Sequence, residues 1–182
     1  MHTFKQSFFL VILALLVSGL VATTTFGQDY PNAWKIVDNE IVAGALSYSM
    51  DNPSHASALS DGFRMAATFR MSDEATGTKA MALIYGLDTD RYLLWFDLDG
   101  SGDLVVEVEG HETITITTDG TGSTAYHTHE MVYTNGSASY WVDGELISTG
   151  WTPSTGNWPL GKMTWGSVSS SGQGAMLMND FT

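Results

Sequence analysis

From Trp34 onward the chain consists of short runs in which apolar and polar residues alternate, separated by clusters of Gly, Asp, Asn and Ser. The clearest run is FRMAATFRM, residues 63–71, whose alternate positions are Phe63, Met65, Ala67, Phe69 and Met71. Successive side chains of a β-strand point to opposite faces of the sheet, so this run predicts a strand with one buried face. No stretch of ten or more residues has the apolar spacing of a helix. The pattern therefore predicts an all-β sandwich or barrel.

Two hairpins follow from the same pattern. RYLLWFDLDGSGDLVVEVEG, residues 91–110, reads as two strands around a Gly-rich turn from Asp99 to Asp103. This register places Trp95 opposite Glu107. The face that we expect to point at the core carries Tyr92, Leu94, Phe96, Leu98, Leu104, Val106 and Val108.

The second hairpin is HTHEMVYTNGSASYWVDG, residues 127–144. Its Asn135-Gly136 pair suits a type I′ turn, which needs positive φ at two successive residues. That turn pairs residues 129–131 with residues 140–142 in antiparallel order, so His129 lies opposite Val142. The last strand, in AMLMNDFT, is expected to pair near the start of the mature chain.

The N-terminal segment has the pattern of a signal peptide. Lys5 precedes the run FFLVILALLV, which is too short to span a bilayer as a helix, and small and neutral residues follow it. We expect cleavage near Gly27, one domain over residues 28–182, and a protein that is secreted or extracellular, in the periplasm or at the cell surface. A retained membrane anchor or a lipoprotein is the alternative, but no Cys is present for lipidation.

Composition excludes several function classes. The net charge is −13, and loss of Lys5 with the signal segment would make it one unit more negative. Nucleic acid and anionic membranes are therefore not expected as partners. Without Cys, thiol redox chemistry is excluded and the fold depends on its core. The acidity serves solubility or, alternatively, cation binding.

Several segments in this order resemble the concanavalin A-like superfamily, specifically laminin-G-like domains and the lectin-like modules of bacterial sialidases. They are GFRMAATFRM, RYLLWFDLDGSGDLVVEV, HTHEMVY followed by SASYWVDGELI, and WGSVSSSGQG before a closing strand. The resemblance covers residues 34–182. It implies a two-sheet antiparallel jelly-roll sandwich that binds glycans or proteins on its concave sheet or rim loops.

An acidic face of the first hairpin is the candidate for catalysis. Trp95 and Asp97 share it with Glu107 and Glu109. Alternate residues of a strand are roughly 6.5–7 Å apart, and glycoside hydrolysis uses carboxylates roughly 5–9.5 Å apart. The resemblance extends to laminarinase-type glucanases, which carry a Glu-x-Asp-x-Glu pattern, but Val105 stands where the first acid belongs. The pair is either catalytic or a solvated outer face.

Two patterns suggest metal sites. Asp97, Asp99 and Asp103 resemble the opening of a calcium loop, although Val108 stands where an EF-hand needs Glu. A tight hairpin turn explains the same residues. His127 and His129 project from one side of a strand, a spacing that suits two metal ligands, but no third ligand is evident. We interpret them as packed or rim histidines.

Loop residues are the best candidates for ligand binding. Trp151 and Trp158 flank the TPSTGN loop, and the GLDTDR loop contributes Asp88, Asp90 and Arg91. Sugar sites stack an aromatic ring on the apolar face of a pyranose and fix its hydroxyls with acids, amides or Arg. Each Trp could equally cover an end of the sandwich. Trp95 joins this set of candidates from the acidic face.

These patterns favour a non-catalytic module that binds carbohydrate or extracellular matrix components. The first alternative is a laminarinase-like glycoside hydrolase that uses Glu107 and Glu109. The second is a structural or adhesive surface protein without affinity for glycans. No cofactor is implied other than calcium at the Asp97 loop.

Overall fold

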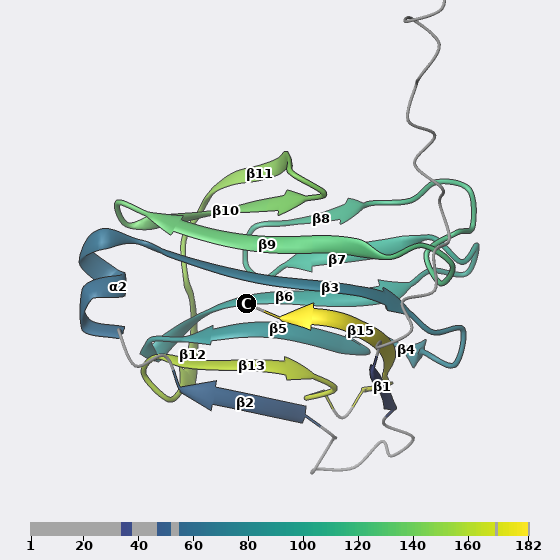
Figure 1. Cartoon of the computed structure of the whole chain (residues 1–182), viewed down its shortest axis with the longest axis horizontal. Coiled ribbons are helices and arrows are strands. Elements are labelled where there is room, and N and C mark those ends of the chain that lie inside the picture. The colour runs from purple at the N-terminus through teal and green to yellow at the C-terminus, as the bar shows by residue number, and fades with distance from the viewer. Residues whose placement is uncertain (1–33, 38–46, 52–54, 170, 182) are drawn as a thin grey trace, which may run out of the picture.

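The computed structural model describes residues 34–37, 47–51, 55–169 and 171–181. The strand pairs of this part of the chain are antiparallel and form two stacked sheets and a two-stranded ribbon (Figure 1). The predicted signal segment, residues 1–27, lies outside it. No helix among the described residues is long and apolar enough to cross a membrane.

One sheet has six strands within the described residues. In spatial order they are β1 (Trp34–Val37), β15 (Ala175–Phe181), β3 (Phe63–Met71), β9 (His127–Thr134), β10 (Ser137–Val142) and β11 (Glu145–Trp151). The pairing of β1 with β15 confirms that the last strand returns to the start of the domain.

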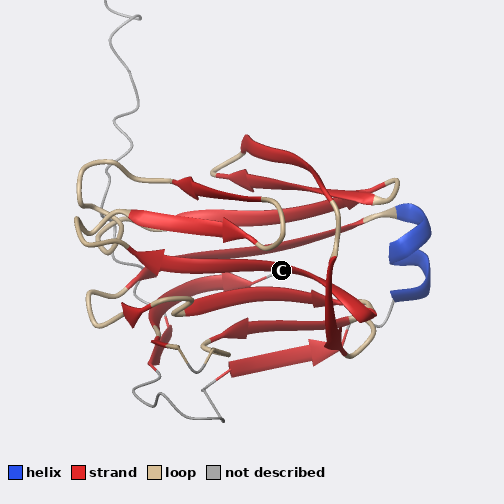
Figure 2. Ribbon diagram, turned by 180° about the vertical axis from the view of Figure 1, so that it is seen from behind, coloured by secondary structure: helices blue, strands red, loops and turns tan. Residues whose placement is uncertain are grey.

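The other sheet has seven strands in the described part. Its order is β2 (Ser47–Asp51), β13 (Lys162–Gly166), β5 (Met81–Gly86), β6 (Asp88–Leu98), β7 (Leu104–Val108) and β8 (Glu112–Thr115), while β12 (Ser154–Trp158) pairs with β6. The ribbon consists of β4 (Thr76–Gly77) and β14 (Gly172–Gln173). A short helix, α2 (His55–Asp61), lies at one end of the sandwich (Figure 2).

Both predicted hairpin registers are confirmed. Residues 129–131 pair with residues 140–142 as the Asn-Gly turn requires. Asn135 and Gly136 have φ angles of 53° and 89°, so both occupy the positive-φ region that a type I′ turn needs. In the first hairpin Trp95 lies opposite Glu107.

The core lies between the two sheets and uses the faces that the alternation predicted. Phe69 of β3 meets Phe96 of β6 with ring centroids 4.9 Å apart and an interplanar angle of 87°, an edge-to-face contact across the sandwich. Both side chains are fully buried. A second, smaller apolar cluster lies on the outer face of the seven-stranded sheet and consists of Ala82, Ile84, Leu93 and Trp95.

Candidate functional site

Two loops that are distant in sequence lie side by side because β12 pairs with the first part of β6. Ser154 pairs with Arg91, Thr155 with Asp90, and Trp158 with Asp88. The predicted TPSTGN and GLDTDR loops are therefore neighbours, which the sequence alone left open.

Gly86 allows this arrangement. A Cβ atom at Gly86 would collide with the carbonyl oxygen of Pro159 and lie 2.9 Å from that of Trp158. Only a residue without a side chain lets the turn after β12 lie so close to the end of β5. The sequence thus places Trp158 over the outer face of the seven-stranded sheet.

Trp158 lines a shallow hollow with a volume of about 320 Å³. Its indole Nε1 donates a hydrogen bond of 3.1 Å to Oγ1 of the buried Thr164, and the ring packs against the outer apolar cluster. The indole is therefore partly exposed but fixed in orientation. The residues that line the hollow are Ser47, Ser49, Asn157, Trp158, Pro159, Lys162 and Thr164.

Arg91 and Glu109 form a two-point ion pair beside this hollow. Arg91 Nε and Nη2 donate to the two carboxylate oxygens of Glu109 at 3.0 and 2.8 Å, and Ser154 Oγ also donates to Glu109. Burial alone would raise the pKa of Glu109, but these hydrogen bonds and the charge of Arg91 outweigh it and lower that pKa. A general acid of glycoside hydrolysis needs the opposite, a raised pKa.

Glu107 is paired as well. Lys79 Nζ lies 3.1 Å from Glu107 Oε1 and 5.2 Å from the centre of the Trp95 ring. Trp95 is only 7% exposed. The face predicted to be acidic thus carries two ion pairs, which neutralise the charges of Glu107 and Glu109. The Trp95 indole beneath them is mostly buried and has little surface on which a ligand could stack.

The predicted calcium loop is wrong, because the three carboxylates bind backbone amides instead of converging. Asp97 Oδ1 accepts from Ala80 N at 2.7 Å, Asp99 Oδ1 from Asp103 N at 3.0 Å, and Asp103 Oδ1 from Gly120 N at 2.7 Å. Among the described residues no three His, Cys, Asp or Glu side chains are grouped so that they could hold a metal ion. The Asp pattern is that of a hairpin turn and a loop anchor.

The prediction of Trp151 as a ligand contact is also wrong. Its side chain is 0% exposed and meets Tyr92 in the main core, with ring centroids 5.0 Å apart and an interplanar angle of 84°. A ring in the core has no free face for a sugar. Of the predicted ligand residues, Trp158 lines the hollow, Asp88 and Asp90 flank it on β6, and Arg91 is held by Glu109.

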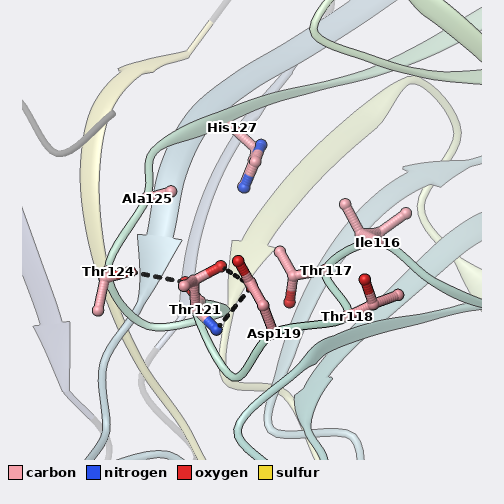
Figure 3. Close-up of a pocket in the computed structure, with 8 residues that line it drawn as sticks. All are labelled: Ile116, Thr117, Thr118, Asp119, Thr121, Thr124, Ala125 and His127. Atoms are coloured by element: carbon pink, nitrogen blue, oxygen red, sulfur yellow. Dashed lines mark hydrogen bonds between the residues drawn. The ribbon is translucent and has the colours of Figure 1, made fainter. Parts of the chain in front are cut away.

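A larger cavity, about 570 Å³ in volume, was missed by sequence reasoning (Figure 3). It lies at the end of the sandwich opposite α2, where residues 116–126 connect β8 to β9 (Figure 1). The length of this loop was the feature of the sequence that could have indicated the cavity, because long ordered loops often carry function. Its lining residues are Ile116, Thr117, Thr118, Asp119, Thr121, Thr124, Ala125 and His127.

The two histidines of β9 occupy different environments. His129 is 0% exposed, and its Nδ1 lies 2.7 Å from the hydroxyl of Tyr140, so it is a packed core histidine as interpreted. His127 lies at the cavity, with Nδ1 2.7 Å from Asp143 Oδ2. The Asp143-Gly144 turn, with φ angles of 51° and 82°, places that carboxylate.

Comparisons with known proteins agree with the predicted resemblance. No family model matches the chain. A sialidase of Vibrio cholerae serotype O1 is 34% identical over 137 residues, which cover 74% of this chain. The chain spans only 17% of the length of that sialidase.

Solved structures of low sequence identity share the fold. A carbohydrate esterase of the Shiga toxin-encoding bacteriophage phi24B matches with a TM-score of 0.58 and 14% identity, over 82% of this chain and 78% of that one. The Trypanosoma rangeli sialidase matches with a TM-score of 0.52 and 10% identity, over 85% of this chain and 26% of that one. At such identities the likeness shows the fold alone.

Proposed function

We propose that this concanavalin A-like domain, homologous to the lectin-like region of a bacterial sialidase, is a non-catalytic carbohydrate-binding module whose ligand site is the hollow beside Trp158. The observation that carries the proposal is the partly exposed indole, which Thr164 and the outer apolar cluster hold in one orientation. A fixed aromatic ring can stack on the C–H face of a pyranose without first losing side-chain entropy.

The groups around the ring suit the hydroxyls and charges of a sugar. Ser47 and Ser49 supply hydroxyls, Asn157 an amide and Lys162 an ammonium group. This set can donate and accept hydrogen bonds, as sugar hydroxyls require. Because Lys162 lines the hollow whereas Asp88 and Asp90 only flank it, we expect acidic sugars to bind more tightly than neutral ones.

The hydrolase alternative lacks support from the geometry. Arg91 keeps Glu109 ionised, and Lys79 pairs with Glu107, so neither carboxylate is arranged as a proton donor. The acidic residues of this face are better explained as members of two ion pairs that stabilise the packing of β5, β6, β7 and β12.

Calorimetric titration against acidic and neutral oligosaccharides, guided by a glycan array, tests the proposal. Replacing Trp158 by Ala should weaken binding by about tenfold or more, since the stacking surface is lost. Trp141→Ala is the matched control, because Trp141 is also partly buried and donates its Nε1 hydrogen to a side-chain hydroxyl, on the other sheet. Equal affinity of both variants, or no glycan bound by the wild type, would refute the proposed site and favour a structural or adhesive protein.

The domain is proposed to act outside the cytoplasm, as the N-terminal segment predicts. An exported, processed protein would begin near Gln28. Mass spectrometry of the protein recovered from a producing cell checks this, and a full-length chain retained in the cytoplasm would contradict it.

A further inference from the structure

The cavity beside His127 adjoins the open side of the sandwich, where β8 and β11 are the edge strands of the two sheets. Along this side the hydroxyl of Ser148 in β11 donates to Glu112 of β8 at 2.5 Å and joins the sheets. Further along, the sheets are bridged by the β8–β9 loop, and the cavity lies beneath it. Its volume of about 570 Å³ falls within the range of about 300–1,000 Å³ found for small-ligand sites.

The walls combine apolar surface with hydrogen-bond acceptors. Ile116 and Ala125 provide the apolar part. Asp119 Oδ1 already accepts hydrogen bonds from the amide and the hydroxyl of Thr121, and the carboxylate is exposed at the rim, with Oδ2 available for a further donor. Thr124 donates its hydroxyl hydrogen to the carbonyl of Thr121, so its oxygen lone pairs remain (Figure 3). A ligand that supplies hydroxyl donors therefore suits Asp119 and Thr124.

Asp143 fixes the His127 ring that closes the cavity on the β9 side. The carboxylate accepts from the Thr128 amide at 2.8 Å as well as contacting His127 Nδ1. Burial alone would raise the pKa of Asp143, but these hydrogen bonds and the histidine charges lower it, so the carboxylate stays ionised. The imidazole therefore forms a rigid wall. It also borders a neighbouring hollow of about 240 Å³ that contains Val142 and Glu145.

The charge of the site selects against anions. Neither hollow has a Lys or Arg among its lining residues, whereas Asp119, Asp143 and Glu145 contribute carboxylates. An anionic sugar would lose its hydration without gaining a Lys or Arg partner from these walls, because the neighbouring Arg70 donates to the Ser123 carbonyl of the same loop. Neutral hydroxyl groups can donate to the carboxylate and to the threonine oxygens, while the C–H groups of a sugar ring contact Ile116 and Ala125.

We propose that this cavity is a second ligand site, for a neutral sugar residue, with Asp119 as the main hydrogen-bond acceptor and the His127 ring as a wall that Asp143 positions. The site lies at the end of the sandwich opposite α2 and shares no lining residue with the Trp158 hollow. The two sites therefore bind independently and differ in charge preference.

Two-dimensional amide NMR of the protein, titrated with D-glucose, D-galactose and D-mannose, tests the proposal, with N-acetylneuraminic acid as the anionic comparison. We expect saturable shifts of residues 116–127 with at least one neutral sugar and none there with the acid. Asp119→Ala should weaken that binding by about tenfold or more, because a hydrogen bond to a charged acceptor is lost.

Asp61→Ala is the matched control, since Asp61 is an exposed carboxylate that accepts from the hydroxyl of Ser60 at the α2 end. Trp158→Ala should leave the shifts at residues 116–127 intact, which separates this site from the first one. If Asp119→Ala lost its native spectrum, Asp119→Asn would be titrated instead. Absence of saturable shifts at residues 116–127 with every neutral sugar, or wild-type affinity in the Asp119 variant, would overturn the proposal.

Discussion

His129 gives the molecule a specific sensitivity to acid. Its ring lies inside the core, 4.6 Å from the Phe69 ring and 4.8 Å from the Phe96 ring between centroids. Burial and, second, the charge of His127 lower its pKa from the ordinary 6.5 to about 3. The imidazole is therefore neutral in the folded protein under conditions in which an exposed histidine becomes charged.

The consequence for stability follows from proton binding. Between pH 6.5 and pH 3 the unfolded chain binds a proton at this position and the folded chain does not. The stability contributed by the neutral histidine is therefore complete above pH 6.5 and is lost as the pH falls, at roughly 1.4 kcal/mol per pH unit. Lowering the pH from 7 to 5 should cost about 2 kcal/mol from this residue alone.

Urea denaturation followed by tryptophan fluorescence measures this loss at pH 7, 6 and 5. The comparison is the double variant His129→Phe with Tyr140→Phe, which removes both partners of the 2.7 Å hydrogen bond and leaves neither buried group unsatisfied. Carboxylates whose lowered pKa does not depend on His129, such as Glu109, act in both proteins and cancel in the difference.

The wild type should lose about 2 kcal/mol more than the double variant between pH 7 and pH 5. Equal losses in the two proteins would refute the reasoning. If the variant does not fold, ¹⁵N NMR of the wild-type His129 ring provides the same test, and an imidazolium signal at pH 5 in the folded protein would contradict the lowered pKa.

Three further predictions concern packing and ion pairs. Arg91→Met should destabilise the fold by about 2–3 kcal/mol, because Glu109 stays mostly buried without its partner. Arg64→Met, at a pair whose Arg side chain is 51% exposed, should cost under about 1 kcal/mol; similar losses in urea denaturation would contradict this difference. Trp151→Ala should cost about 3–5 kcal/mol by the same assay, and a cost near zero would mean that the ring is not in the core. Gly86→Ala should displace the turn after β12 and abolish binding at the adjacent hollow, and retained affinity in calorimetry would rule out that role.

Local sequence patterns were sufficient to predict the features that depend on residues close together in sequence. The Asn135-Gly136 turn set a register that the structure confirms, because two successive positive-φ residues permit one hairpin geometry. The alternation in β3, β6 and β7 identified the core face, since the period of a strand is set by its backbone. Trp151 was misjudged because its burial depends on the opposite sheet.

The same distinction separates the two kinds of acidic residue. In sequence, Asp97, Asp99 and Asp103 resemble cation ligands. In the structure the carboxylates of Asp97 and Asp103 accept hydrogen bonds from the backbone amides of residues 80 and 120, which are distant from them along the chain. Arg91 and Glu109 were separate candidates until β6 and β7 brought them within 2.8 Å of each other. The sequence shows which ionisable side chains are present, and the order of the strands in the sheets determines which of them come into contact.

The sequence by itself determined the all-β class, the two hairpins and the acidic character of this protein, because those follow from side-chain alternation, turn conformation and composition. The choice of a sandwich over a barrel came from the family resemblance. Only the tertiary structure decided where a ligand can enter. The Trp158 hollow exists because β12 crosses to β6, and the His127 cavity exists because a long loop bridges two sheet edges. Contacts between segments far apart in the chain depend on the packing of the whole sandwich, and no local pattern encodes them.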